Sequence, residues 1–243
     1  NAKKEGYVMR NFCRKIGPKR TISDIDRKDI ERIYNRKEAT SDHTKNSDYI
    51  SLNTFLNWCI KNGYRKKESP VFRPKKPQSK LPKFITINQF AKLLQSYIDT
   101  ARKTNASSDT SWVPLSWMIL AGTGMRPIEL AHLRVKHIEK ESILIGGDYI
   151  TKVRSERRVP LLFESQCAID VLTDNNFRSR DSNMANSDLL LGRKPTYAKR
   201  FISRCFSKTW QSTFPDYPKR TLYNLKDTFC VRFLCDDTLD IRS

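Results

Sequence analysis

The chain has 243 residues, with 46 Lys and Arg against 26 Asp and Glu and a formal net charge of +20. Its length allows one large or two small domains with buried cores, and its charge favours nucleic acid as a partner, before an anionic membrane surface. No apolar run reaches the roughly 20 residues of a membrane-spanning helix. The polar, basic Asn1–Arg10 stretch predicts no signal peptide.

Apolar residues at helical intervals predict helices around Ile22–Tyr34 and Leu52–Ile60, the second of which ends at Asn62-Gly63. The polar stretch Thr40–Asp48 between them is expected to be a loop. Residues 69–83 follow, with four prolines and five basic residues. Because each proline disfavours helix for the residue before it, this stretch predicts an extended, cationic linker at a domain boundary.

The second part of the chain begins with a capping-box pattern, Thr86-x-x-Gln89, ahead of a helix. A polar loop over Arg102–Ser111 and a buried helix over Leu115–Gly122 come next. Pro127 suits the first turn of a helix that runs to Arg134. The hydrophobic period then predicts short strands and later helices. The strands are 142–145, 149–153 and 157–161, and the helices are about 164–172, 196–210 and 222–234.

Cysteines and histidines show no pattern that would hold a metal. The six cysteines form no Cys-x-x-Cys pair, and the three histidines do not converge on a ligand spacing. We therefore expect reduced thiols, locally bonded or solvated histidines, and neither a metal nor a cofactor. These residues are Cys13, Cys59, Cys167, Cys205, Cys230, Cys235, His43, His132 and His137.

Arg126 directly follows the most apolar run of the chain. A guanidinium at the edge of a buried core is costly unless it holds an anion. The segment around it, Thr123–Leu130, resembles the one that carries the first catalytic arginine of the tyrosine recombinases, the phage integrase family. Two more segments follow in that family's order: Thr151–Leu161 resembles its lysine-bearing β-hairpin, and Tyr223–Phe229 resembles its His-x-x-Arg-His segment.

The resemblance implies a mainly α fold with a small antiparallel β-sheet, arranged as a two-domain, recombinase-like clamp around duplex DNA. Residues 1–72 would form the helical core-binding domain, 73–83 the basic linker and 84–243 the catalytic-type domain. Such a protein is a site-specific recombinase or integrase. It breaks and rejoins double-stranded DNA through a 3′-phosphotyrosine, works as a homo-tetramer, and is found in the cytoplasm with the nucleoid, or in a eukaryotic nucleus.

Carried over residue by residue, the resemblance assigns Arg126 to the first arginine and Lys152 to the hairpin lysine. Two arginines suit the charged phosphorane, and a lysine can protonate the departing 5′ oxygen. The alternative for Arg126 is a structural arginine paired with Glu129. The alternative for Lys152 is an exposed lysine within a basic patch.

The third segment departs from the family. Tyr223 stands at the first histidine, Lys226 at the second arginine and Asp227 at the second histidine. Lysine keeps the charge but loses the two-pronged grip, and a carboxylate beside the scissile phosphate repels it. The alternative is an ordinary amphipathic helix. The family's tyrosine nucleophile lies downstream of this segment, so we assign it to none of these 243 residues. Three alternatives stay open: the part that carries it is deleted, unobserved or absent from this protein.

Other basic residues are candidates for contacts with the DNA backbone, which fix position but not sequence. A solvated basic surface is the alternative for them. Besides an active recombinase, the sequence leaves open a relative that binds DNA without cleaving it, and an RNA-binding or transcription-regulating module. The candidate DNA-binding residues are Arg73, Lys75, Lys76, Lys80, Arg154, Arg157, Arg158, Lys199 and Arg200.

Overall fold

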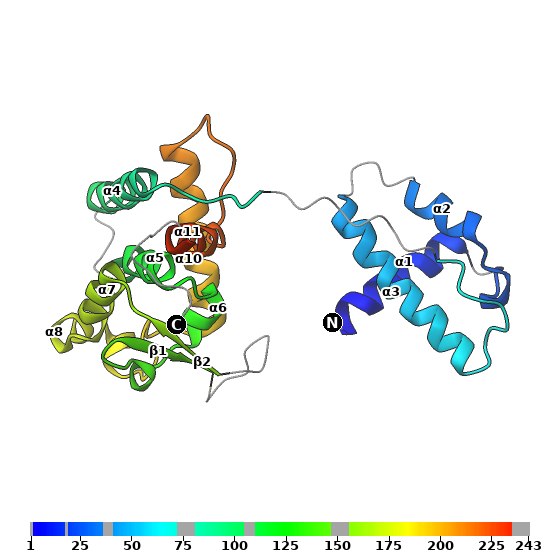
Figure 1. The fold of residues 1–243 in the computed structure, drawn as a ribbon, viewed down its shortest axis with the longest axis horizontal. Helices are drawn as coiled ribbons and strands as arrows, with labels where there is room; N and C mark the ends of the chain where they lie inside the picture. Colours follow the sequence, from blue (N-terminus) through cyan, green and yellow to red (C-terminus); the bar gives the residue numbers. More distant parts are fainter. Residues whose placement is uncertain are drawn as a thin grey trace. The chain divides into compact units, whose positions relative to one another are not determined.

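The fold is seen in a computed structural model. The chain forms two compact units, Asn1–Lys80 and Leu81–Ser243. The helices and strands of both are labelled in Figure 1. The residues that the structure describes are 2–17, 19–35, 41–71, 81–104, 110–146 and 156–234.

The first unit is built from helices in its described residues. Its elements are α1 (Ala2–Ile16), a short 3-10 helix (Ile22–Asp24), α2 (Arg27–Asn35) and α3 (Asp42–Lys61). Apolar side chains from these helices form one core, made of Phe12, Ile25, Ile30, Tyr49, Leu52 and Leu56. The predicted loop at Thr40–Asp48 is wrong, because α3 begins at Asp42 and Ser41 caps it by accepting the Thr44 N–H at 3.3 Å.

Arg65 fastens the chain after α3 to the segment before α2. Its side chain is buried, and it donates to the carbonyl oxygens of Ile22 and Ile25, at 2.5 and 3.0 Å, and of Glu68 at 3.1 Å. A buried guanidinium is tolerated only when its donors are satisfied, as they are here. Arg65 is therefore a structural residue of this unit.

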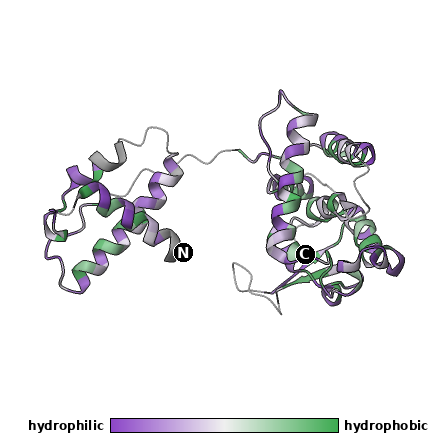
Figure 2. Ribbon diagram, turned by 180° about the vertical axis from the view of Figure 1, so that it is seen from behind, coloured by the Kyte–Doolittle hydropathy of each residue, from purple (hydrophilic) through white to green (hydrophobic). Residues whose placement is uncertain are grey.

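The second unit is mainly helical with a small sheet, which confirms the fold class predicted from the sequence. Its helices are α4 (Ile87–Lys103), α5 (Trp112–Thr123), α6 (Pro127–His132), a 3-10 helix (Val135–His137), α7 (Phe163–Thr173), α8 (Asn175–Ser179), α9 (Ser182–Ala185), α10 (Pro195–Thr213) and α11 (Asn224–Leu234). In Figure 2 hydrophilic residues dominate α4, whereas β1 is hydrophobic. No helix among the described residues has the length and apolarity that crossing a membrane requires.

Helix α5 is the centre of this unit, as its apolar sequence predicts (Figure 1). Trp117, Ile119 and Leu120 are at most 1% exposed. Helices α4, α6, α7, α10 and α11 all pack against it. Helix α4 begins with the predicted capping box: the Thr86 hydroxyl accepts the Gln89 N–H at 3.2 Å, and the Gln89 amide accepts the Thr86 N–H at 3.1 Å.

The sheet has two antiparallel strands, β1 (Ser142–Ile145) and β2 (Arg157–Pro160). Their register pairs Ser142 with Pro160 and Ile145 with Arg157. The first and third predicted strands therefore pair directly with each other. The predicted middle strand, 149–153, lies outside the described residues.

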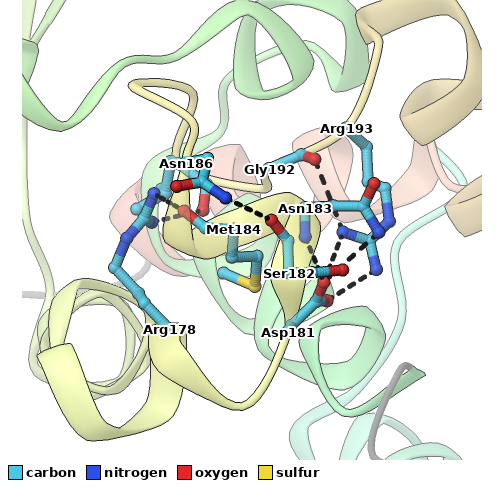
Figure 3. A network of polar contacts seen from close by, with 9 residues as sticks. Arg178, Asp181, Ser182, Asn183, Met184, Asn186, Gly192 and Arg193 are labelled. Carbon is cyan, nitrogen blue, oxygen red and sulfur yellow. Dashed lines mark hydrogen bonds and ion pairs between the residues drawn. The ribbon is translucent and has the colours of Figure 1, made fainter.

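A buried arginine organises the chain between α8 and α10. The Arg178 guanidinium donates to the Met184 carbonyl at 2.7 Å (Figure 3). The same guanidinium donates to the carbonyls of Leu172 and Leu190, both at 3.2 Å. It also donates to the carbonyls of Ser187 and Leu189. One side chain thus satisfies the carbonyls of a stretch with little regular structure, which holds this stretch against the core.

Candidate functional site

The candidate site begins where α5 ends. Gly124 takes a left-handed conformation with φ of +60°, and its N–H donates to the Leu120 carbonyl at 3.1 Å. This reversal directs the chain to Arg126, which is extended and caps α6, while Pro127 occupies the first helical turn as predicted. Arg126 therefore stands at the rim of the core, with 26% of its side chain exposed.

Glu129 holds Arg126 in place. Arg126 Nη1 lies 3.0 Å from Glu129 Oε1, and the Arg126 backbone N–H donates to Glu129 Oε2 at 2.8 Å. The ion pair that the alternative interpretation predicted is thus present. It uses one of the five N–H donors of the guanidinium, so donors remain for a bound anion. The pair orients Arg126 and leaves its capacity for an anion intact.

A second arginine binds the same carboxylate. Arg157 of β2 donates from Nη2 to Glu129 Oε2 at 2.7 Å, and the Glu129 side chain is 2% exposed. Burial raises the pKa of the Glu129 carboxyl, but the hydrogen bonds from Arg157 and from the backbone and side chain of Arg126 outweigh it and lower the pKa overall. A carboxylate that stays ionised between two arginines fixes both of them.

Lys152 and Arg154 lie outside the described residues, between the two paired strands. Arg157 follows Lys152 by five positions, and its strand is fastened to α6 through Glu129. The end of the predicted lysine hairpin is therefore anchored beside Arg126. Sequence reasoning treated Glu129 as a partner of Arg126 alone; its contact with Arg157 depends on a strand register that no local pattern encodes.

Helix α11 brings the third segment to the α5–α6 junction. The Phe229 ring lies so close to Gly124 that a Cβ added there would be 2.3 Å from Phe229 Cδ1. Thr228 accepts the Ile85 N–H at 2.8 Å, which ties α11 to the chain before α4. Lys226 is one turn before Phe229 on the same helix. The segments that carry Arg126 and Lys226 thus meet in the structure.

Three residues of the third segment differ from the family's His-x-x-Arg-His pattern. Lys226 and Asp227 lie in the first turn of α11, and Tyr223 precedes this helix. Tyr223 is 48% exposed. The Asp227 carboxylate accepts the Asn224 side-chain amide at 3.2 Å and lies where an acidic group stabilises a helix N-terminus. The structure therefore gives Asp227 a helix-stabilising contact.

The remaining DNA-binding candidates fall into three groups. Arg73, Lys75, Lys76 and Lys80 lie outside the described residues. Arg158 of β2 pairs with Glu139, its Nε 3.0 Å from Oε2. Lys199 and Arg200 lie on α10.

Of the histidines, His137 is buried, and its Nδ1 accepts the Arg134 N–H at 3.3 Å. Within the described ranges, no three His, Cys, Asp or Glu side chains group as metal ligands would.

The fold and the site at the α5–α6 junction point to one family of proteins. The chain belongs to the phage integrase family, whose model matches residues 83–221, more than half of the chain. This confirms the family resemblance drawn from the sequence, and the matched residues include the first two of its three segments. A search of curated protein sequences found no match.

Solved structures share the fold across nearly the whole chain. A lambda integrase dimer bound to a COC′ core site has a TM-score of 0.69 and 15% identity, covering 93% of this chain and 76% of that one. A lambda integrase tetramer bound to a Holliday junction has a TM-score of 0.71 and 15% identity, covering 96% and 67%. The Tn1549 transposon integrase in complex with circular intermediate DNA has a TM-score of 0.71 and 17% identity, covering 98% and 83%.

Proposed function

We propose that this chain is the DNA-binding and phosphate-activating part of a site-specific recombinase that acts through a 3′-phosphotyrosine. Family membership and the α5–α6 junction support the proposal. The observation that carries it is the buried Glu129 carboxylate, which orients Arg126 beside the helix of Lys226.

The proposed chemistry follows from the groups at the junction. Arg126 and Lys226 would bind the non-bridging oxygens of one phosphate and stabilise the charge that develops on it. Lys152 would give a proton to the departing 5′ oxygen. Tyr223 would donate a hydrogen bond where the family has a histidine. The tyrosine nucleophile is assigned to none of the described residues.

The DNA would be a duplex held by both units. The net charge of +20 and the basic linker support this part of the proposal.

We also propose that the protein assembles as a tetramer on DNA, as the lambda integrase does on a Holliday junction. Mass measurements of the protein–DNA complex, by sedimentation or light scattering, test this. A complex with a single copy on a two-site DNA would contradict it.

Covalent trapping tests the chemical proposal. The protein in its full natural length is incubated with nicked duplexes carrying the end sequences of its own element, and adducts are resolved on a denaturing gel. We expect an adduct that Arg126→Gln abolishes. Binding without any adduct on all these ends would contradict cleavage.

The third segment favours a second candidate, a relative that binds duplex DNA without cutting it. Lys226 lacks the two-pronged grip of arginine, and by the family resemblance Asp227 would place a carboxylate near the phosphate. The variant Lys226→Arg distinguishes the two candidate functions, a recombinase and a DNA-binding protein that does not cleave. If cleavage rises sharply while affinity stays the same, the protein is a recombinase weakened at one position; if neither protein cleaves, the binding function stands.

A further inference from the structure

A pocket lies on helix α10. It has a volume of about 360 Å³, near the lower end of the roughly 300–1,000 Å³ found for small-ligand sites. The residues that line it recur every three or four positions, so they share one face of the helix. They are Thr196, Tyr197, Arg200, Phe201 and Arg204. We call this site the α10 pocket.

The α10 pocket is separate from the site at Arg126. Phe201 of the pocket stacks on Trp112, the first residue of α5, whereas Arg126 comes shortly after the last residue of that helix. At 1.5 Å per residue, the 12 residues of α5 span about 18 Å. A ligand in the α10 pocket therefore does not occupy the candidate phosphate site.

An aromatic stack leads from the core to the pocket surface. The Trp112 and Phe201 rings lie 5.7 Å apart at 30°, and the Phe201 and Tyr197 rings lie 5.6 Å apart at 23°. Trp112 is 2% exposed and Tyr197 is 51% exposed. Tyr197 is the outer end of the stack. One face of its ring rests on Phe201, and its exposed part lines the pocket.

The surroundings of this stack are cationic. The Arg204 guanidinium carbon lies 5.6 Å from the centre of the Phe201 ring. In the described part of the chain, neither Arg200 nor Arg204 forms an ion pair with a carboxylate. The sequence from 189 to 215 contains no acidic residue and six basic ones. These are Arg193, Lys194, Lys199, Arg200, Arg204 and Lys208.

The inner end of the stack is held by a buried ion pair. Arg193 Nη2 lies 2.6 Å from Asp181 Oδ2, with side-chain exposures of 9% and 11% (Figure 3). The Arg193 guanidinium carbon is 5.7 Å from the centre of the Trp112 ring. The charge of Arg193 is balanced by Asp181, and its guanidinium packs on Trp112, the buried end of the stack. The α10 pocket is thus preorganised, which lowers the entropic cost of binding.

We propose that the α10 pocket binds an unpaired nucleotide of a DNA strand, with its base stacked on Tyr197 and its phosphates beside Arg200 and Arg204. A base inside a duplex has both faces covered by its neighbours, whereas an unpaired base can offer one face to Tyr197. Stacking on an aromatic ring accepts any base, and arginines near it neutralise the flanking phosphates. The inference rests on the proposed DNA-binding function and adds a preference for locally unpaired strands.

The test compares two DNAs that differ in one feature: a fully paired duplex, and the same duplex with a short run of unpaired thymidines in one strand. Affinities of the full chain for both are measured at one salt concentration. We expect the wild-type protein to prefer the second DNA by about tenfold, in line with stacking of one base. Tyr197→Leu should abolish the preference, and Tyr197→Phe, which keeps the ring, should retain it.

A fluorescent base in the unpaired run reports stacking directly. Its emission should be quenched by the wild-type protein and by Tyr197→Phe but not by Tyr197→Leu, with thermal unfolding confirming that all three are folded.

Equal affinity of the wild-type protein for both DNAs, or a preference that Tyr197→Leu retains, overturns the inference. If Arg204→Gln weakens both DNAs equally and Tyr197→Leu weakens neither, the pocket holds duplex phosphates only and the inference fails. Absence of binding to either DNA would overturn the proposed function instead.

Discussion

Arg157 Nη2 lies 2.7 Å from Glu129 Oε2, so the strand that follows the predicted lysine hairpin is fastened to the helix that Arg126 caps. The buried carboxylate also accepts from Arg126 itself. Glu129 thus links β2 to Arg126 through one residue. We expect the site to respond as a unit when Glu129 is changed.

Replacing Glu129 by glutamine should lower the free energy of unfolding by about 1–3 kcal/mol at neutral pH, because three charge-assisted hydrogen bonds to a buried carboxylate are weakened. The pKa of this carboxyl is lowered by folding. Its contribution is therefore complete above the unfolded pKa, about 4.3, and is lost as the pH falls through the folded value. Urea unfolding of both proteins across this range measures the difference.

A matched control is Glu139→Gln, which removes the exposed partner of Arg158 on the same strand. Exposed ion pairs contribute little, so we expect a small change in the urea midpoint at any pH. If Glu129→Gln behaves like this control at neutral pH, the buried carboxylate does not hold the junction.

The contact between Gly124 and Phe229 predicts a large effect of a single methyl group. Gly124→Ala adds a Cβ that would lie 2.3 Å from the Phe229 ring, at a residue with φ of +60°. We expect a loss of about 2–4 kcal/mol in unfolding free energy, from backbone strain and overpacking together. Gly63→Ala is the control, because φ of Gly63 is +76° but no atom lies within 4 Å of an added Cβ. Only backbone strain should then lower the unfolding free energy, by about 1 kcal/mol. Calorimetry resolves both, and equal costs would contradict the close packing of α11 on α5.

The sequence predicted those parts of the fold that depend on local patterns. The capping box at Thr86 and the buried helix around Ile119 are both encoded within a few residues. The first turns of α3 were missed because they are polar and its apolar stripe begins only at Tyr49. The tie between Glu129 and Arg157 joins residues 28 positions apart, so only the folded strand register reveals it.

Arg126→Lys tests whether the guanidinium acts on the phosphate. Lysine keeps the charge but not the planar fork, so we expect cleavage to fall by about 100-fold or more while duplex affinity changes little. Arg134→Lys is a suitable control, because Arg134 pairs with Asp188 at the surface. Single-turnover cleavage and equilibrium binding separate the two effects. Equal losses in both variants would argue against a specific role for position 126.

The predicted linker contacts can be read from salt dependence. Replacing Arg73, Lys75, Lys76 and Lys80 together by glutamine should reduce the slope of log K against log salt concentration by about 3–4, if each side chain neutralises one phosphate. Titrations of a labelled duplex at several salt concentrations give the slope. An unchanged slope would remove the linker from the interface.

The pKa of Tyr97 should influence the stability of the second unit at alkaline pH. Burial raises the pKa of its hydroxyl to about 12, and its ring packs edge-on against Trp117 at 5.0 Å. In the unfolded chain the hydroxyl ionises near pH 10, so between about pH 10 and 12 the unfolded state loses a proton that the folded state keeps. The stability that Tyr97 contributes is therefore complete below pH 10 and falls as the pH rises through this window. Tyr97→Phe should reduce this alkaline loss, so its urea midpoint should fall less than that of the wild-type protein. Parallel decline of the two midpoints would contradict the raised pKa of Tyr97, a partly buried residue that packs against the core beside Trp117.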